Sequence, residues 1–102
     1  MKILWTDTAK DDLRNIYQLI KSSSHSTELA RKTIYKIRKK IRLLQSNPEI
    51  GAIQEDLSNQ TYTYRYLVSG SYHIIYRVAQ EVQIVFINII FDTQKNSSYS
   101  AT

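Results

Sequence analysis

Apolar residues recur at intervals of three and four positions in two segments of the N-terminal half. The first segment runs from Thr8 to about Lys21, and the second runs from Ser26 or Thr27 to Gln45. This spacing places the apolar side chains of each segment on one face of a helix. The first face carries Ala9, Leu13, Ile16, Tyr17 and Ile20, and the second carries Leu29, Ala30, Ile34, Ile37, Ile41 and Leu44. The pattern therefore predicts two amphipathic helices.

The polar stretch from Ser22 to Ser26 separates these two helices. It is too short for a linker between domains, so we expect it to join the helices as an antiparallel hairpin. The second helix should end at Asn47-Pro48, because proline cannot continue the helical hydrogen bonds and the residue before it avoids helical geometry. Residues 49–60 have no clear period and are expected to form a loop.

Four other runs have the composition or the alternation of β-strands. They are Lys2–Thr6, Tyr62–Val68, Tyr72–Val78 and Val82–Phe91, the second and third joined by a tight hairpin around Ser69-Gly70. The run from Val82 to Phe91 is apolar on both faces, which is typical of a central strand covered on both sides. The sequence thus predicts an N-terminal strand and a three-stranded antiparallel meander at the end of the domain.

The predicted order of elements is strand, helix, helix, strand, strand, strand. Two helices on one face of a small, largely antiparallel sheet would bury both apolar stripes, so we expect an α+β fold of two layers. A chain of 102 residues is long enough for one core without disulfides. We expect a single domain over residues 1–96, followed by a polar tail at residues 97–102.

The charge is concentrated in the second predicted helix. The chain has a formal net charge of +5, and the segment from Ser26 to Ser46 holds seven basic residues against one acid, Glu28. The basic residues are Arg31, Lys32, Lys36, Arg38, Lys39, Lys40 and Arg42. Such a surface could bind nucleic acid, attract an acidic partner segment, or simply be solvated. The sequence leaves these three interpretations open.

Several classes of protein are disfavoured by composition. The chain has no cysteine, which excludes disulfides, thiolate nucleophiles and cysteine-ligated zinc. No apolar run approaches the roughly 20 residues that span a bilayer, and the N-terminus becomes polar too early for a signal peptide. We expect a soluble cytoplasmic protein without a metal or a cofactor.

The predicted hairpin combines guanidinium, imidazole and phenol groups. Arg65, His73 and Arg77 are interspersed with Tyr62, Tyr64, Tyr66, Tyr72 and Tyr76. Arginines on a small sheet could contact phosphates, or they could be paired with Asp92 or Glu81. His73 could act as a general acid or base, or it could be an ordinary strand residue. The tyrosines could stack on bases or pack on one another.

Taken together, these segments resemble the RelE/ParE superfamily of type II toxins. The resemblance rests on order and spacing over nearly the whole chain. Its parts are Trp5-Thr6 with Ala9, Leu13, Ile16 and Ile20, a basic second helix ending in Leu44-x-x-Asn47-Pro48-x-x-Gly51, the strands Tyr64–Val68 and Tyr72–Val78, and the final run Phe91–Asn96. It implies a toxin encoded beside an antitoxin that blocks it, in a complex of the two proteins.

The superfamily implies two alternative activities. RelE-like members cleave messenger RNA on the ribosome without a metal, using basic residues and a C-terminal acid–base residue. Here that mechanism would place Arg65 and Arg77 on the phosphate, with His73 or Tyr99 moving protons and Lys95 as a further cation. ParE-like members instead bind DNA gyrase.

Two departures from the pattern of RelE-like ribonucleases favour the ParE-like branch. Near the C-terminus, RelE-like ribonucleases carry a pair of basic residues followed by an aromatic acid–base residue. This chain has only Lys95 there, with Tyr99 four residues later. The segment Gln54–Gln60 is acidic and would repel a ribosomal substrate. We therefore predict a toxin that binds gyrase rather than an enzyme. A ribosome-dependent endoribonuclease and an inactive interaction module are the alternatives.

The resemblance also implies that the antitoxin covers the helical hairpin with an amphipathic segment. The helix faces predict which apolar residues would border its groove. They are Trp5, Tyr17, Ile20, Leu29 and Tyr35.

Overall fold

A computed structural model describes residues 1–59 and 61–94, and it has the predicted fold class. In chain order the elements are β1 (Lys2–Trp5), α1 (Asp7–Ser24), α2 (Thr27–Arg42), the 3₁₀ turn η1 (Leu43–Gln45), β2 (Ala52–Ile53), β3 (Tyr64–Ser69), β4 (Tyr72–Ala79), η2 (Gln80–Val82) and β5 (Ile84–Asp92). The N-terminal strand, the helical hairpin and the meander of β3, β4 and β5 are all present. The predicted α+β fold is therefore confirmed.

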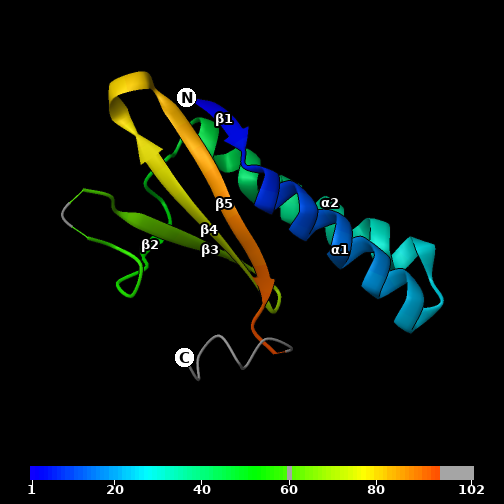
Figure 1. Ribbon diagram of the computed structural model, residues 1–102. Coiled ribbons are helices and arrows are strands. Elements are labelled where there is room, and N and C mark those ends of the chain that lie inside the picture. Colours follow the sequence, from blue (N-terminus) through cyan, green and yellow to red (C-terminus); the bar gives the residue numbers. More distant parts are fainter. Residues whose placement is uncertain (60, 95–102) are drawn as a thin grey trace.

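All five strands belong to one sheet with the order β1-β5-β4-β3-β2. β1 pairs in parallel with β5, and the other neighbours are antiparallel. Both helices lie on the same side of this sheet, so the molecule has two layers (Figure 1). Within the described residues, neither helix is long and apolar enough to cross a membrane.

The helix boundaries follow from local hydrogen bonds. Thr6 caps α1 by accepting from the backbone N–H of Ala9, and Ser26 caps α2 by accepting from that of Leu29. The predicted break at Ser22 is wrong, because α1 continues to Ser24. Serine is tolerated there because the Ser24 hydroxyl donates to the carbonyl of Ile20, and His25 ends the helix in the left-handed conformation with φ 55°.

The core lies between the helices and the sheet. Its largest fully buried side chains are Tyr76, Ile37, Leu44, Ile74, Ile87 and Val85. The prediction that the last strand is covered on both sides is wrong, since both helices pack on one face only. Phe86 and Ile89, on the other face of β5, are half-buried. The Arg77 guanidinium partly covers Phe86, with its carbon 5.0 Å from the ring centre.

Residues 49–60 contain a short strand that periodicity did not predict. β2 has two residues and pairs with Arg65 and Tyr66 of β3. Two residues cannot show an alternating pattern, so this strand is defined only by its tertiary pairing. It makes the sheet one strand wider than the sequence predicted.

Asp12 connects α1 to β5. Its Oδ2 accepts a hydrogen bond of 2.9 Å from the backbone N–H of Ile90. The register of β4 and β5 shifts beside this point, which leaves Asn88 as an extra residue on β5, as in a β-bulge. The Thr6 hydroxyl donates to the carbonyl of Asn88 at 3.0 Å. The start of α1 is thus attached to an irregularity of the central sheet.

The protonation of Asp12 should affect stability. Partial burial raises the pKa of Asp12 above its ordinary value of 3.8; the Ile90 hydrogen bond opposes this rise, and the neighbouring Asp11 charge adds to it. The folded state therefore holds the proton more tightly than the unfolded state. Consequently, the contribution of this group to the free energy of unfolding falls as the pH rises through the range just above 3.8.

The substitution Asp12→Asn keeps an acceptor for Ile90 but removes the charge. Its stability relative to the wild type should increase with pH through this range, as measured by urea unfolding between about pH 3.5 and 6. Asp12→Ala leaves the Ile90 amide unpaired and should cost about 1–3 kcal/mol. A constant difference between Asp12→Asn and the wild type would contradict this account.

Candidate functional site

The two predicted arginines lie on opposite faces of the sheet. In the register of β3 and β4, Arg65 is paired with Tyr76, and Arg77 is paired with Tyr64. Tyr76 belongs to the core beneath the helices, so Arg65 lies on this core face. Arg77 lies on the other face, which no helix covers and which we call the open face. The fold therefore does not bring the two guanidinium groups together.

The loop before β2 holds Arg65. Its Nη1 donates to the carbonyl of Gly51 at 2.8 Å and, at 3.4 Å, to that of Glu49. The N–H of Gly51 in turn donates to the hydroxyl of Tyr76 at 2.9 Å. Burial raises the pKa of Tyr76, whereas the Gly51 hydrogen bond and the Arg65 charge lower it. Arg65 therefore helps to fix the loop against the core.

Arg77 is held between two aromatic rings of the open face. Its guanidinium carbon lies 4.3 Å from the ring centre of Tyr62 and 5.0 Å from that of Phe86. Among the described residues, the guanidinium has no hydrogen-bond or ion-pair partner; the one ion pair found there joins Arg14 and Asp11. The predicted alternative of pairing with Asp92 or Glu81 is thus not realised. A stacked, half-buried guanidinium with unused N–H donors is oriented to receive a carboxylate or a phosphate.

A row of rings continues across the open face. His73 stacks on Tyr66 with ring centres 4.9 Å apart, and it meets Phe91 at 5.6 Å. The ring of Tyr62 meets that of Tyr64 edge-on at 6.4 Å. His73 therefore lies on the same face as Arg77, among aromatic side chains. The sequence did not predict these roles, because the Phe86 ring reaches Arg77 only when β5 pairs with β4, and the Tyr62 ring only when β3 pairs with β4.

Lys95 and Tyr99, the remaining candidates for RNA chemistry, lie outside the described residues. Within residues 1–59 and 61–94, no cluster of histidine and carboxylate side chains is suited to a metal ion.

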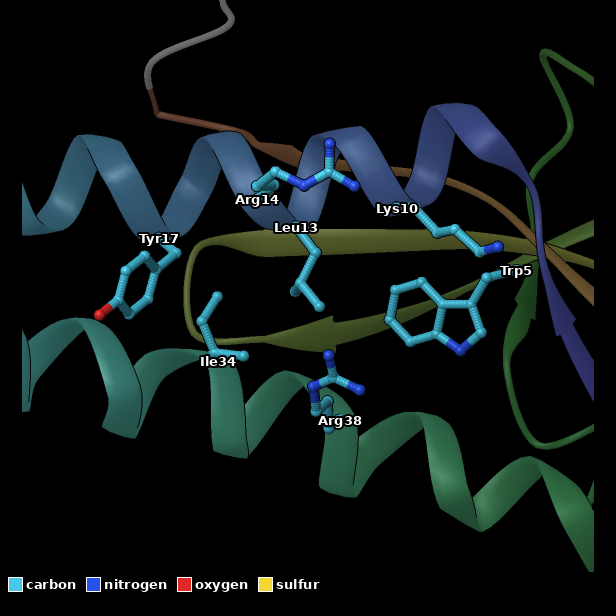
Figure 2. A pocket seen from close by; sticks show the side chains of 7 residues that line it. All are labelled: Trp5, Lys10, Leu13, Arg14, Tyr17, Ile34 and Arg38. Atoms are coloured by element: carbon cyan, nitrogen blue, oxygen red, sulfur yellow. The ribbon is translucent and has the colours of Figure 1, made fainter.

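A groove of about 510 Å³ separates α1 from α2 next to the end of β1. It is lined by Trp5, Lys10, Leu13, Arg14, Tyr17, Ile34 and Arg38. Figure 2 shows Leu13 from α1 facing Ile34 and Arg38 from α2, with Trp5 at the end where β1 leads into α1. The Arg38 guanidinium lies 5.7 Å from the Trp5 ring centre. We call this space the helical groove.

Only some of the residues predicted to bind an antitoxin line the helical groove. Trp5 and Tyr17 do, whereas Ile20 packs partly buried against the core. Leu29 and Tyr35 are 47% and 56% exposed and do not line it. Of the three cations in this groove, Arg38 belongs to the basic surface predicted for the second helix, whereas Lys10 and Arg14 of α1 were not predicted.

All seven basic residues of α2 are exposed. Arg38 reaches the helical groove, while Lys36, Lys39 and Lys40 border a second groove beside β3. Four of the seven basic residues of this helix therefore border one of two separate grooves.

Three solved structures with a similar fold are described as toxins or as a toxin–antitoxin system. A chromosomal ParDE toxin–antitoxin system from P. aeruginosa is 23% identical, with a TM-score of 0.74 over 90% of this chain and 95% of that chain. A YoeB/ParE toxin from Agrobacterium tumefaciens is 22% identical, with a TM-score of 0.58 over 90% and 98% of the two chains. A free RelE mutant from E. coli is 16% identical, with a TM-score of 0.58 over 97% and 90%. At these identities the likeness shows the fold alone.

A comparison with curated protein sequences finds no match. The family model of the ParE toxin of the type II toxin–antitoxin system parDE, however, matches residues 3–95. This range includes both helices and the whole sheet except Lys2, the first residue of β1. The chain therefore belongs to the ParE toxin family of type II toxin–antitoxin systems.

Proposed function

We propose that this toxin arrests growth by binding DNA gyrase in the cytoplasm through the open face of its sheet, with Arg77 as the central contact. Gyrase is the target that the resemblance to ParE-like toxins implies. The observation that carries the proposal is the separation of the two arginines. Arg65 donates to loop carbonyls on the core face, while Arg77 is stacked on the open face with its donors unused.

This separation is poorly suited to RNA cleavage. Cleavage without a metal needs a base, an acid and several cations around one phosphate. Arg65 and Arg77 cannot contact the same phosphate from opposite faces of a sheet. A binding protein needs less, because one oriented guanidinium among aromatic rings can anchor a carboxylate of a protein partner.

A second candidate is the ribosome-dependent endoribonuclease activity. It is favoured by His73, which shares the open face with Arg77 and stacks on Tyr66. An imidazole and a guanidinium beside aromatic rings could receive an unstacked nucleotide. This alternative differs from gyrase binding in a measurable product, namely cut transcripts.

We further propose that a cognate antitoxin neutralises the toxin by occupying the helical groove, so that the two proteins form a hetero-oligomer. The floor of the groove is apolar, through Leu13 and Ile34, and Trp5 closes one end. Its charged lining residues are all cations. These features fit an amphipathic helix whose apolar residues enter the groove and whose carboxylates meet Lys10, Arg14 and Arg38.

Expression of the chain without its antitoxin tests these proposals. Growth should stop, plasmid supercoiling should change, and transcript ends should stay intact. Co-expression of the protein encoded in the neighbouring reading frame should restore growth. Purified toxin should inhibit supercoiling by purified gyrase. Codon-phased transcript cleavage with normal supercoiling would instead establish the endoribonuclease, and normal growth would indicate an inactive module.

A further inference from the structure

The basic residues of α2 form two separate stripes. With a rotation of about 100° per residue, Arg31, Arg38 and Arg42 fall within about 40° of one another. The lysines at positions 32, 36, 39 and 40 fall within about 100° on another side of the helix. Arg38 of the arginine stripe lines the helical groove. Lys36, Lys39 and Lys40 of the lysine stripe line a second groove beside β3. The two stripes therefore serve different surfaces.

The lysine stripe borders a groove between α2 and the β3–β4 turn. This groove has a volume of about 510 Å³ and is lined by Lys36, Lys39, Lys40, Leu43, Val68, Ser69 and Gly70. Leu43 and Val68 are almost half exposed in it, and no carboxylate lines it. We call it the lysine groove. It shares no residue with the helical groove and none with the site around Arg77.

The fold gains nothing from placing these lysines together. Lys36 has a lysine three positions later and others four positions before and after it, and each such like-charge pair costs about 0.2–0.5 kcal/mol in a helix. Among the described residues, none of them is in an ion pair. Their side chains are exposed and do not support the core. An unneutralised cluster with a stability cost indicates a polyanionic partner.

We propose that the lysine groove binds the phosphate backbone of a duplex nucleic acid without sequence preference. The lysine stripe spans nine residues of helix, a rise of about 12 Å, so its four charges lie about 4 Å apart on average. Three of them line the groove, and Lys32 lies about one turn beyond. This matches the phosphates of one strand, which succeed one another about every 3.4 Å along the duplex axis. A duplex carries this density of negative charge along its whole length, whereas a peptide must place several carboxylates on one face of a folded segment. A nucleic acid is therefore the polyanion that we assign to the lysine groove.

The chemistry of the side chains agrees with this assignment. Lysine carries a compact charge on a flexible chain and contacts phosphates as a point charge, without reading bases. Leu43 and Val68, which are 46% and 45% exposed, supply the apolar part of the lining beside the lysines. This inference is independent of the target proposed above, because it concerns only α2 and the β3–β4 turn.

Binding of the full-length chain to fluorescent 20-base-pair duplexes tests the inference. One probe is DNA and one is RNA of the same sequence, which distinguishes the two possible sources of the backbone. With about four phosphate contacts, affinity should fall roughly 100-fold between 50 and 200 mM salt. The variant K36Q/K39Q/K40Q should reduce the slope of log affinity against log salt by about 3 and lower the affinity at least tenfold in 0.1 M salt.

The variant K2Q/K21Q/R31Q is the matched control. It has the same net charge as the first variant, and none of its three positions lines either groove, so it should bind nearly as tightly as the wild type. Circular dichroism should show both variants folded, since all six side chains are exposed. If both variants lost the same affinity for the duplexes, net charge alone would explain binding, and the proposal would be overturned. Absence of binding to either duplex, or equal lysine-dependent binding of polyglutamate, would also overturn it.

Discussion

The substitution Gly51→Ala is expected to lower the free energy of unfolding by about 3 kcal/mol or more. A Cβ atom at this position would lie 2.6 Å from the carbonyl oxygen of Tyr66 and 2.7 Å from the hydroxyl of Tyr76. The first contact is with the backbone of β3, which cannot move away like a flexible side chain. The loop would therefore have to shift, and the buried hydrogen bond from Gly51 to Tyr76 would be strained or lost.

The change should extend to Arg65, whose Nη1 donates a hydrogen bond of 2.8 Å to the carbonyl of Gly51. Urea unfolding followed by circular dichroism gives the free energy, and a loss of this size is a large part of the 5–15 kcal/mol typical of a domain. Gly70→Ala is the control, because Gly70 has φ +61° but no atom within 4 Å of an added Cβ. It should cost only about 1–2 kcal/mol. If Gly51→Ala were the milder change, the close packing of the loop would be refuted.

The substitution Arg77→Ala should abolish growth arrest while leaving the protein folded. If Arg77 receives a carboxylate of gyrase in a desolvated interface, its loss should weaken binding by about 2–5 kcal/mol, or roughly 30-fold to several thousandfold. The effect on stability should be small, because Arg77 is half-buried and has no hydrogen-bond partner among the described residues. Gyrase binding by the purified variant and growth after induction are the two measurements.

Three further variants separate charge from orientation. Arg77→Lys keeps the charge but loses the planar donors, so it should recover only part of the affinity. Tyr62→Leu removes one of the two rings that orient the guanidinium, and it should weaken gyrase binding less than Arg77→Ala does. Arg14→Ala removes an exposed cation on α1 and should leave gyrase binding unchanged. If cells that express Arg77→Ala still stop growing completely, the proposal that Arg77 on the open face binds gyrase is refuted.

The sequence predicted the elements with strong periodicity and missed those without it. α2, the turn at Ser69-Gly70 and the three strands of the meander follow from apolar spacing and turn residues. The extension of α1 to Ser24 was missed, because serine is a poor helix former unless its hydroxyl finds a local acceptor. β2 was missed because a strand of two residues carries no pattern.

The candidate site was predicted less completely than the fold. Composition identified Arg65, His73 and Arg77, but it did not indicate that the arginines are on different faces. That outcome depends on strand register, since a shift of one residue moves a side chain to the other face of a sheet. The partners of Arg77 lie on a loop and on β5, so local sequence could not associate them with it.

The sequence by itself determined the kind of molecule: two amphipathic helices, a meander, a basic second helix, and the family-wide order of residues. These are properties of spacing and composition along the chain, which local interactions enforce wherever the chain folds. The tertiary structure alone decided which charges are engaged and which are available. Arg65 is bound by loop carbonyls and Arg77 is not, and the cations of α2 border two separate grooves. The reason is that a side chain's partners are set by contacts between residues distant in sequence.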